Sequence, residues 1–217
     1  PLPNIRDFTN NLRGCTVFSK LDLVKGYHQV PMSETDICKT AIVTPFGLFK
    51  FLSMPFGLKN AAQTFQRLMD RIFRGLPYVF IYLDDVLVAS RNRKLHIKHL
   101  RVVLDLLVQN GLILNLDKCS FAQSEIDYLG HKITAAGIIP LRRHVDALLL
   151  QPRPQDVRGL QRFLGMINFY RRFLPGVAGT LRPLTDALKG NPKSLPWSKE
   201  LQTAFDSAKS ALASAVF

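Results

Sequence analysis

Three aspartates are placed where they could share a divalent metal ion. Asp84 and Asp85 stand side by side between two apolar, β-prone runs, residues 79–83 and 86–88, and this pattern predicts a hairpin with both acids at its tip. A two-residue loop favours Asn-Gly or Asp-Gly, so the Asp-Asp pair is better explained by its charge than by turning. Asp22 closes another strand-like run. Because carboxylate oxygens are the ligands that Mg²⁺ prefers, we predict a metal site that offsets the repulsion between the three acids.

A small antiparallel sheet with two packed helices is predicted to hold these acids. The first strand covers residues 16–21. Apolar residues at helical spacing predict one helix over residues 61–74, with Asn60 as its cap and Gly75 at its end, and a second over about 94–110. Each helix has one apolar face, as expected for packing against a sheet. Strand, helix, hairpin and helix in this order predict a compact α+β unit.

The second helix also carries two histidines, His96 and His99, on one face. Together with Cys119 they offer only three metal ligands, so we interpret them as exposed helical histidines. The apolar face of this helix is predicted from five residues: Leu100, Val103, Leu104, Leu107 and Val108.

Shorter β-prone segments occupy the intervening parts of the chain. Residues 37–44 and 48–54 are predicted to form a hairpin through a Pro-Phe-Gly turn that ends at Gly47. Residues 112–115 and 128–134 are predicted as further strands.

The segment from residue 140 to 193 is strongly basic. It holds ten Lys or Arg against three acidic residues, which suits a surface that contacts phosphates, although a solvated basic surface has the same composition. Helical spacing recurs in four places from this segment onward: at about 145–150, at 157–170 after an Asp156 cap, near 183–188, and over 197–217.

The whole-chain composition is that of a globular protein with a polyanionic partner. The chain has 217 residues, 47% of them hydrophobic, and a formal net charge of +13. Its three cysteines lack Cys-x-x-Cys spacing, which argues against a disulfide framework and a cysteine zinc site. No apolar run reaches the roughly 20 residues that span a bilayer, and no secretory signal is visible. We therefore expect a soluble, intracellular protein without a membrane partner and, because it starts at Pro1, a piece of a longer polyprotein.

Several motifs follow one another in the order found in one family. They are Phe18-Ser19-Lys20-Leu21-Asp22 with Gly26-Tyr27-His28-Gln29, Met54-Pro55-Phe56-Gly57-Leu58, Tyr82-Leu83-Asp84-Asp85, Tyr128-Leu129-Gly130-His131 and Phe163-Leu164-Gly165. Over nearly its whole length the chain resembles the reverse transcriptase of long-terminal-repeat retrotransposons of the gypsy type. The resemblance implies a right-hand polymerase fold, in which fingers and palm are built on antiparallel sheet with packed helices and are followed by a helical thumb.

The resemblance also implies a two-metal site and a reaction. Asp22, Asp84 and Asp85 would hold two Mg²⁺ ions, for which Mn²⁺ could substitute, and the backbone carbonyl of Leu23 would be a further ligand. The implied activity is RNA-directed DNA polymerase, which extends a primer on an RNA or DNA template with deoxynucleoside triphosphates. An RNA-templated RNA polymerase would share the metal chemistry, but not the pairing of the Tyr-Leu-Asp-Asp motif with the Tyr-Leu-Gly-His motif.

Further positions match the substrate-binding residues of that family. Nucleotide binding is implied for Tyr27, Phe56, Gly57 and Lys118, with Tyr27 as the floor of the sugar pocket. A grip on the primer terminus is implied for Leu129, Gly130 and His131. Contacts with the template-primer backbone are implied for Arg158, Arg162, Arg171 and Arg172.

The same resemblance divides the chain into three regions: residues 1–139 as partial fingers and palm, 140–193 as a thumb-like helical region, and 194–217 as the truncated start of a connection or RNase H-like region. The implied partners are the remaining parts of a Pol polyprotein, namely RNase H, integrase and protease, within a cytoplasmic particle. The basic fingers residues that the family uses on the triphosphate have no counterpart in this chain. A catalytically incompetent fragment that only binds nucleic acid is therefore the alternative function.

Overall fold

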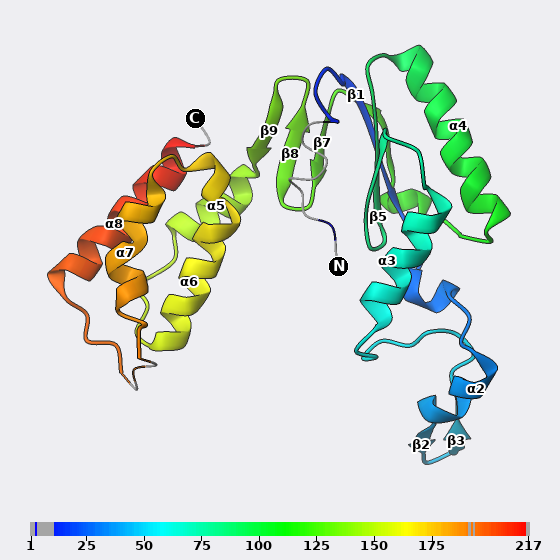
Figure 1. The fold of residues 1–217 in the computed structure, drawn as a ribbon, viewed down its shortest axis with the longest axis horizontal. Helices are drawn as coiled ribbons and strands as arrows, with labels where there is room; N and C mark the ends of the chain where they lie inside the picture. The colour runs from blue at the N-terminus through cyan, green and yellow to red at the C-terminus, as the bar shows by residue number, and fades with distance from the viewer. Residues whose placement is uncertain (1–2, 4–10, 191, 193, 216–217) are drawn as a thin grey trace. The chain divides into compact units, whose positions relative to one another are not determined.

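The computed structural model of the chain describes residue 3 and residues 11–190, 192 and 194–215. The chain forms two compact units (Figure 1). The first, Pro1–Leu129 with Ile133–Gly137, is called the sheet unit, and the second, Gly130–Lys132 with Ile138–Phe217, is called the helical unit.

The sheet unit is built on a four-stranded sheet in the order β4-β5-β1-β6. Its strands are β1 (Val17–Asp22), β4 (Val79–Tyr82), β5 (Asp85–Ser90) and β6 (Ser120–Gln123). β1 lies between β5 and β6 and pairs antiparallel with both. In the β1–β5 pair, Leu21 lies opposite Val86 and Asp22 lies opposite Asp85. Because side chains alternate between the two faces of a strand, the apolar pair and the acidic pair lie on opposite faces of the sheet.

Two helices cover the apolar face of this sheet, as Figure 1 shows. They are α3 (Ala61–Ile72) and α4 (Arg93–Gln109), close to the predicted bounds. Phe65, Met69 and Val103 from these helices join Leu21 and Val86 in one core. The apolar stripe predicted for α4 is correct except at one position, since the side chain of Val108 is 76% exposed.

The ends of the two helices differ in how they are capped. Asn92 caps α4, since its Oδ1 accepts a hydrogen bond from the Leu95 N–H at 2.9 Å. Asn60 occupies the N-cap position of α3, but its side chain accepts no hydrogen bond from the helix, so the predicted capping interaction is wrong. Gly75 follows α3 with φ of 84°, a backbone conformation that glycine adopts without strain.

The remaining predicted strands of the sheet unit are shorter than expected. The first hairpin consists only of β2 (Ile42–Thr44) and β3 (Gly47–Phe49), because the chain before it forms α2 (Glu34–Ile37) and a 3₁₀ turn, Cys38–Thr40. The strand predicted over residues 112–115 is a single bridge between Leu23 and Leu114.

A separate three-stranded sheet, in the order β7-β8-β9, contains the boundary between the units. Its strands are β7 (Glu125–Tyr128), β8 (His131–Thr134) and β9 (Gly137–Pro140). The single strand predicted over residues 128–134 is wrong, because Leu129 and Gly130 have φ of 47° and 77° and form a turn. Two successive residues with positive φ reverse the chain direction in a tight hairpin.

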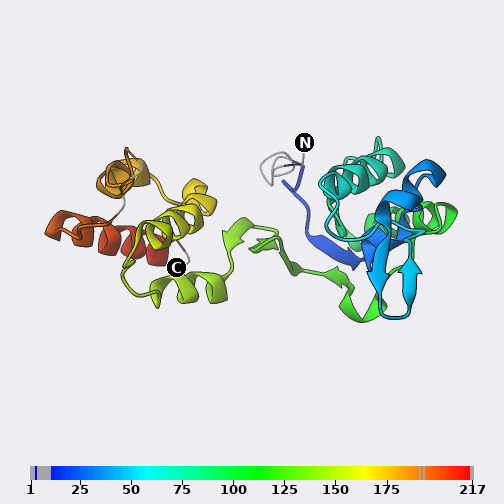
Figure 2. The same ribbon diagram turned by 90° about the horizontal axis from the view of Figure 1, so that it is seen from below.

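The described residues of the helical unit form four α-helices, and Figure 2 shows these helices gathered together. They are α5 (Arg142–Leu149), α6 (Val157–Phe169), α7 (Val177–Asp186) and α8 (Lys199–Ser214). Asp156 caps α6 as predicted, since its Oδ1 accepts a hydrogen bond from the Gly159 N–H at 2.6 Å. α7 starts well before the predicted segment and contains Pro183.

One apolar core joins all four helices of this unit. Val145 of α5, Leu160 and Phe163 of α6, Leu184 of α7 and Phe205 of α8 are all buried in it. The family resemblance placed residues 194–217 in a region separate from the thumb-like helices, whereas α8 packs within the same core as those helices. None of the helices in the described ranges is long and apolar enough to cross a membrane.

A buried polar network fastens α4 to the sheet. His96, interpreted from the sequence as exposed, has no exposed surface. Its Nε2 lies 2.7 Å from Ser19 Oγ on β1, and its Nδ1 lies 2.8 Å from Ser90 Oγ on β5. Ser90 Oγ also lies 2.8 Å from His99 Nδ1, and the His99 ring stacks on Tyr78 at 3.5 Å. These partners come from β1, β5 and the segment before β4, so no local pattern in α4 identifies them.

This network predicts that the protein loses stability in weak acid. Burial, and then the neighbouring His99, lower the pKa of His96 below its usual 6.5. Below pH 6.5 the unfolded chain therefore binds a proton that the folded protein does not, and the free energy of unfolding falls as pH decreases toward the lower, folded-state pKa. Urea unfolding between about pH 7.5 and about pH 5.5 should show this fall. In His96→Gln the fall should be smaller, and an equal fall in both proteins would contradict the assignment.

Candidate active site

The three predicted carboxylates lie at one end of the β1–β5 pair. Asp22 and Asp85 are directly opposite each other, and Asp84 precedes Asp85 in the hairpin between β4 and β5. The hairpin loop is Leu83-Asp84 and not Asp84-Asp85, because Tyr82 pairs with Asp85. The predicted tip is thus displaced by one residue, which places Asp85 in the strand and only Asp84 in the turn.

The backbone of this turn is held in an unusual conformation by α3. Leu83 has φ of 55°, which is uncommon for a bulky residue. Its N–H donates a hydrogen bond to Gln66 Oε1 at 2.8 Å, and Gln66 Nε2 donates to the Ile81 carbonyl at 3.3 Å and to Asp70 Oδ1 at 2.8 Å. Gln66 is 2% exposed. A buried amide from α3 therefore fixes the turn that carries Asp84.

Gly26 allows the chain after β1 to approach this turn closely. A Cβ atom at this position would lie 3.0 Å from Phe65 Cζ and 3.1 Å from Asp84 Cβ. The next residue, Tyr27, packs its ring edge-on against Phe65 and Phe56, with centroids 5.3 and 5.5 Å away. The absence of a side chain at Gly26 thus lets the 3₁₀ turn Gly26–Gln29 bring Tyr27 beside the acids.

The charges of the site act on one another. Burial raises the pKa of the Asp84 carboxyl above its ordinary value, a hydrogen bond from its own backbone lowers it, and the charges of Asp85 and Asp22 raise it further. Lys118 opposes this rise. Lys20 Nζ lies 2.9 Å from Asp85 Oδ1, so one of the acids already has a cationic partner. The raised pKa of Asp84 means that the site favours added positive charge.

This donor set fits a hard divalent cation. Mg²⁺ is usually bound through one or two carboxylates together with substrate phosphates, and less often by a cage made entirely of protein groups. Among the described residues no three His, Cys, Asp or Glu side chains are grouped closely enough to hold a metal by themselves. Asp22, Asp84 and Asp85 instead present oxygen ligands and unbalanced negative charge at one end of the β1–β5 strand pair.

The residues predicted to bind nucleotide are brought together in part. Burial and then Asp84 raise the pKa of Tyr27, and Lys118 in turn lowers that of Asp84, so both residues interact with the acidic site. Phe56 is 68% exposed beside Tyr27. Gly57 has φ of 93°, so glycine is required there by backbone conformation and not by a crowded neighbour.

Backbone contacts hold the end of β1 in place. Leu23 is buried and forms the isolated bridge with Leu114. The Asp22 N–H donates to Cys119 Sγ at 3.4 Å, and the Asp22 carbonyl accepts a hydrogen bond from the Asn115 N–H at 2.8 Å. Cys119 therefore supports the acidic site through the backbone of Asp22, a role that its spacing in the sequence does not reveal.

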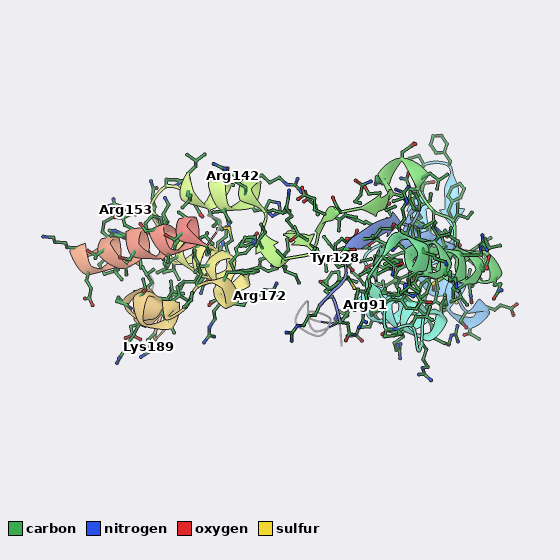
Figure 3. All side chains as sticks on the ribbon, turned by 90° about the horizontal axis from the view of Figure 1, so that it is seen from above. Arg91, Tyr128, Arg142, Arg153, Arg172 and Lys189 are labelled. Carbon is green, nitrogen blue, oxygen red and sulfur yellow. The ribbon has the colours of Figure 1, made fainter. Side chains whose placement is uncertain are left out.

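The Tyr-Leu-Gly-His motif begins at the sheet. The hydroxyl of Tyr128, labelled in Figure 3, donates to the backbone carbonyl of Asp85 at 3.0 Å. The turn Leu129-Gly130 follows. The side chain of His131 is fully buried among the rings of Phe169, Tyr170 and Phe173, with centroids 5.0 to 5.8 Å away. A contact between His131 and a primer would therefore use its backbone.

The arginines predicted to contact nucleic acid lie on or after α6. Arg158, Arg162 and Arg171 are exposed, and Arg172 lies over the Phe173 ring at 4.4 Å. Arg162 lines a hollow of about 680 Å³ between α5 and α6, together with His144, Leu148, Gly165 and Phe169. Figure 3 shows that Arg142, Arg153, Arg172 and Lys189 lie on different sides of the helical unit, so its excess charge is not confined to one face.

Sequence reasoning missed three residues that position the acids: Gln66, Lys20 and Cys119. The signal at Gln66 is an uncharged amide between Phe65 and Met69 on an otherwise apolar face. Lys20 stands within the motif that ends at Asp22, and the strand period places it on the same face as Asp22.

A protein-family model described as "Reverse transcriptase (RNA-dependent DNA polymerase)" matches residues 1–133. Curated relatives include the retrovirus-related Pol polyprotein from transposon 297 of Drosophila melanogaster, 38% identical over 96% of this chain, and that from transposon opus of the same species, 40% identical over 92%. The Tf2-3 transposon polyprotein of Schizosaccharomyces pombe is 33% identical over 99% of the chain. The chain covers 20%, 20% and 16% of these three polyproteins, about a fifth of their length.

Solved structures show the same fold. The foamy viral protease-reverse transcriptase in complex with double-stranded DNA matches with a TM-score of 0.88 at 24% identity, over 98% of this chain and 38% of that one. Its complex with an RNA/DNA hybrid matches with a TM-score of 0.86 at 23% identity, over 98% of this chain and 29% of that one. These likenesses confirm the predicted α+β polymerase fold and the resemblance to a retrotransposon reverse transcriptase.

The hydrogen bond between Gln66 and the turn predicts a specific loss of stability. Gln66→Leu keeps a side chain of similar length but leaves the half-buried Leu83 N–H without its acceptor. This loss should lower the free energy of unfolding by about 1–3 kcal/mol. Urea denaturation measures this change.

Gln63→Leu is the matched control, because Gln63 is exposed on the same helix. Its effect should stay within about 0.5 kcal/mol. Equal effects of the two substitutions would show that Gln66 does not hold the turn.

Proposed function

Because the chain belongs to the reverse transcriptase family, we propose that it is the catalytic core of an RNA-directed DNA polymerase. The observation that supports this most directly is the placement of Asp22 opposite Asp85 with Asp84 in the adjoining turn. The reaction is nucleotidyl transfer, in which the primer 3′-hydroxyl attacks the α-phosphorus of a deoxynucleoside triphosphate and pyrophosphate departs.

In this proposal the three aspartates would hold two Mg²⁺ ions, with the Leu23 carbonyl as an additional ligand. When bound, the ions lower the pKa of the attacking hydroxyl and stabilise the charge on the departing pyrophosphate. Lys20 orients the carboxylate of Asp85 through their 2.9 Å ion pair. Gln66 holds the backbone of the turn before Asp84, and the backbone of Gly26 packs closely against the Cβ of Asp84. These contacts position Asp84 before substrate binds.

Residues around the acids receive the nucleotide. Lys118 supplies positive charge near Asp84, on the side where the triphosphate would lie. Tyr27 is held by Phe65 and Phe56, and its ring is the floor against which the sugar rests. The positive φ of Gly57 lets the loop after Phe56 expose backbone to the nucleotide.

The partners follow from the same proposal. An RNA or DNA template with its primer would contact the turn Leu129-Gly130 and the backbone of His131. It would also contact the exposed Arg158, Arg162 and Arg171 and the half-buried Arg172. The foamy viral relatives were solved with double-stranded DNA and with an RNA/DNA hybrid. We propose residues 1–139 as palm with partial fingers and 140–193 as thumb, within a Pol polyprotein that also supplies RNase H, integrase and protease.

Asp84→Asn should abolish primer extension without unfolding the protein. Loss of a metal ligand should lower the extension rate at least about a hundredfold, since metal stabilisation of the transition state is worth several kcal/mol. Because burial and then the neighbouring acids raise the pKa of Asp84, removing its charge should leave the stability at neutral pH unchanged or raise it. The measurements are extension on RNA and DNA templates with Mg²⁺, and urea unfolding.

The matched control is Asp105→Asn, which removes the same charge from an exposed position on α4 and should leave extension unchanged. Near-normal extension by Asp84→Asn would contradict the two-metal assignment. A parent chain that binds primer-template but never extends it would favour the alternative, a nucleic-acid-binding fragment.

Tyr27 should decide between ribose and deoxyribose. A purely apolar pocket rejects an added hydroxyl only about a hundredfold, so strong rejection requires a rigid group where the 2′-hydroxyl would lie. Tyr27→Ala should raise the ribonucleotide-to-deoxynucleotide ratio of kcat/KM by about ten- to a hundredfold. Tyr27→Phe keeps the ring against Phe65 and should keep the ratio. An unchanged ratio in Tyr27→Ala would return this residue to a packing role.

A further inference from the structure

The exposed side of α3 and the turn after it carry arginines that the carboxylate site does not use. Arg67, Arg71 and Arg74 are exposed and line a hollow of about 650 Å³. Thr64 and Asp70 also line it. We call Arg67, Arg71 and Arg74 the α3 arginine row.

Two of the three arginines lie on α3, and the third follows its end. Arg67 and Arg71 are four residues apart, so at 3.6 residues per turn their Cα atoms lie within about 40° of each other around the helix and about 6 Å apart along its axis. Arg74 lies in the turn that follows Ile72. Because all three line one hollow, they suit an anion that carries several phosphate groups.

The arginines have no anionic partner of their own. Within the described part of the chain, neither an ion pair nor a hydrogen bond engages any of the three side chains. Asp70 is the acid that shares the hollow, and its Oδ1 already accepts a hydrogen bond from Gln66 Nε2 at 2.8 Å. Arg67 and Arg71 are one turn apart, an arrangement of like charges that destabilises an isolated helix. The row therefore adds nothing to the stability of α3 until an anion is bound.

The chemistry of the hollow indicates phosphate groups. A guanidinium presents a planar fork that binds phosphate oxygens through two hydrogen bonds, and a threonine hydroxyl such as that of Thr64 is a common additional donor. The other described lining residues, Val30 and Leu68, are aliphatic. Because no aromatic ring lines the hollow among the described residues, it offers no surface on which bases could stack.

We propose that the α3 arginine row binds the backbone phosphates of a single nucleic-acid strand without reading its sequence. Along the axis of a duplex each strand presents a phosphate about every 3.4 Å. The phosphates of an extended single strand are farther apart, so each of the three arginines can contact a different phosphate. The regular spacing of charge along such a strand fits the row better than an acidic protein segment does. This binding needs neither metal nor nucleotide, and it is independent of the proposed polymerase activity.

The test measures how salt weakens the binding of a fluorescent single-stranded oligonucleotide of mixed sequence to the whole chain, without divalent ions, by anisotropy. The variant is the triple substitution Arg67→Gln, Arg71→Gln and Arg74→Gln. Each phosphate contact on a single strand contributes about 0.7 to the slope of log K against log salt, so the slope should fall by about 2. Glutamine is a good helix former, and circular dichroism checks that α3 is intact.

The matched control is Lys94→Gln, Lys98→Gln and Arg101→Gln on α4. These residues are exposed, have the same spacing, carry the same total charge and line neither of the two hollows. Their removal should change the slope by less than half as much. A triple arginine-to-lysine variant of the α3 row should keep most of the slope, because the charges remain.

Three results would overturn the proposal. Equal slopes in the α3 and α4 variants would show that only net charge matters. An unchanged slope in the α3 variant would show that the row does not contact the strand. If the α3 variant lost its affinity for an acidic peptide but kept its full affinity for the oligonucleotide, the hollow would be assigned to a protein segment. Since no extension is measured, none of these results depends on whether Asp84 is catalytic.

Discussion

The antiparallel register of β1 and β5 is the constraint on which the acidic site depends. A slip of β1 by one residue would turn Asp22 toward the face covered by α3 and α4 and turn Leu21 away from that core. Burying Leu21, Val86 and Val88 contributes about 1.5–3 kcal/mol each. On the other face, the Lys20–Asp85 ion pair offsets part of the repulsion between the acids. Packing on one face of the sheet and this ion pair on the other therefore hold the two aspartates opposite each other.

Helix α3 connects this register to the turn and to the protein surface. Its inner side packs Phe65 and Met69 into the core, and Gln66 holds the Leu83-Asp84 turn from the edge of that side. Its outer side and the turn after it carry the α3 arginine row. One amphipathic helix thus positions a metal-binding carboxylate through an amide and presents cations to solvent, and a change in its rotation would disturb both.

The helical unit separates packing from charge in a similar way. In α6, Leu160, Phe163 and Ile167 are buried, whereas Arg158 and Arg162 are exposed. The helical period alone accounts for this separation, so the basic composition of the segment does not weaken its core. His131 does not follow this separation of polar and apolar residues, because its polar side chain is buried among aromatic rings of the same unit.

The sequence by itself determined the elements with a strong local pattern. Apolar periodicity and capping chemistry within a few neighbouring residues determine the approximate bounds of α3, α4 and α6, the Asp156 cap and the strand that ends at Asp22. The ordered motifs identify the family. Tertiary structure alone decided the rest: the loop is Leu83-Asp84 because Gln66, 17 residues away, accepts the Leu83 N–H, and His96 is buried because Ser19, 77 residues away, completes its hydrogen bonds. A local pattern records which side a residue faces, but the partner that makes a strained turn or a buried polar group stable comes from distant parts of the chain, and only folding brings it into contact.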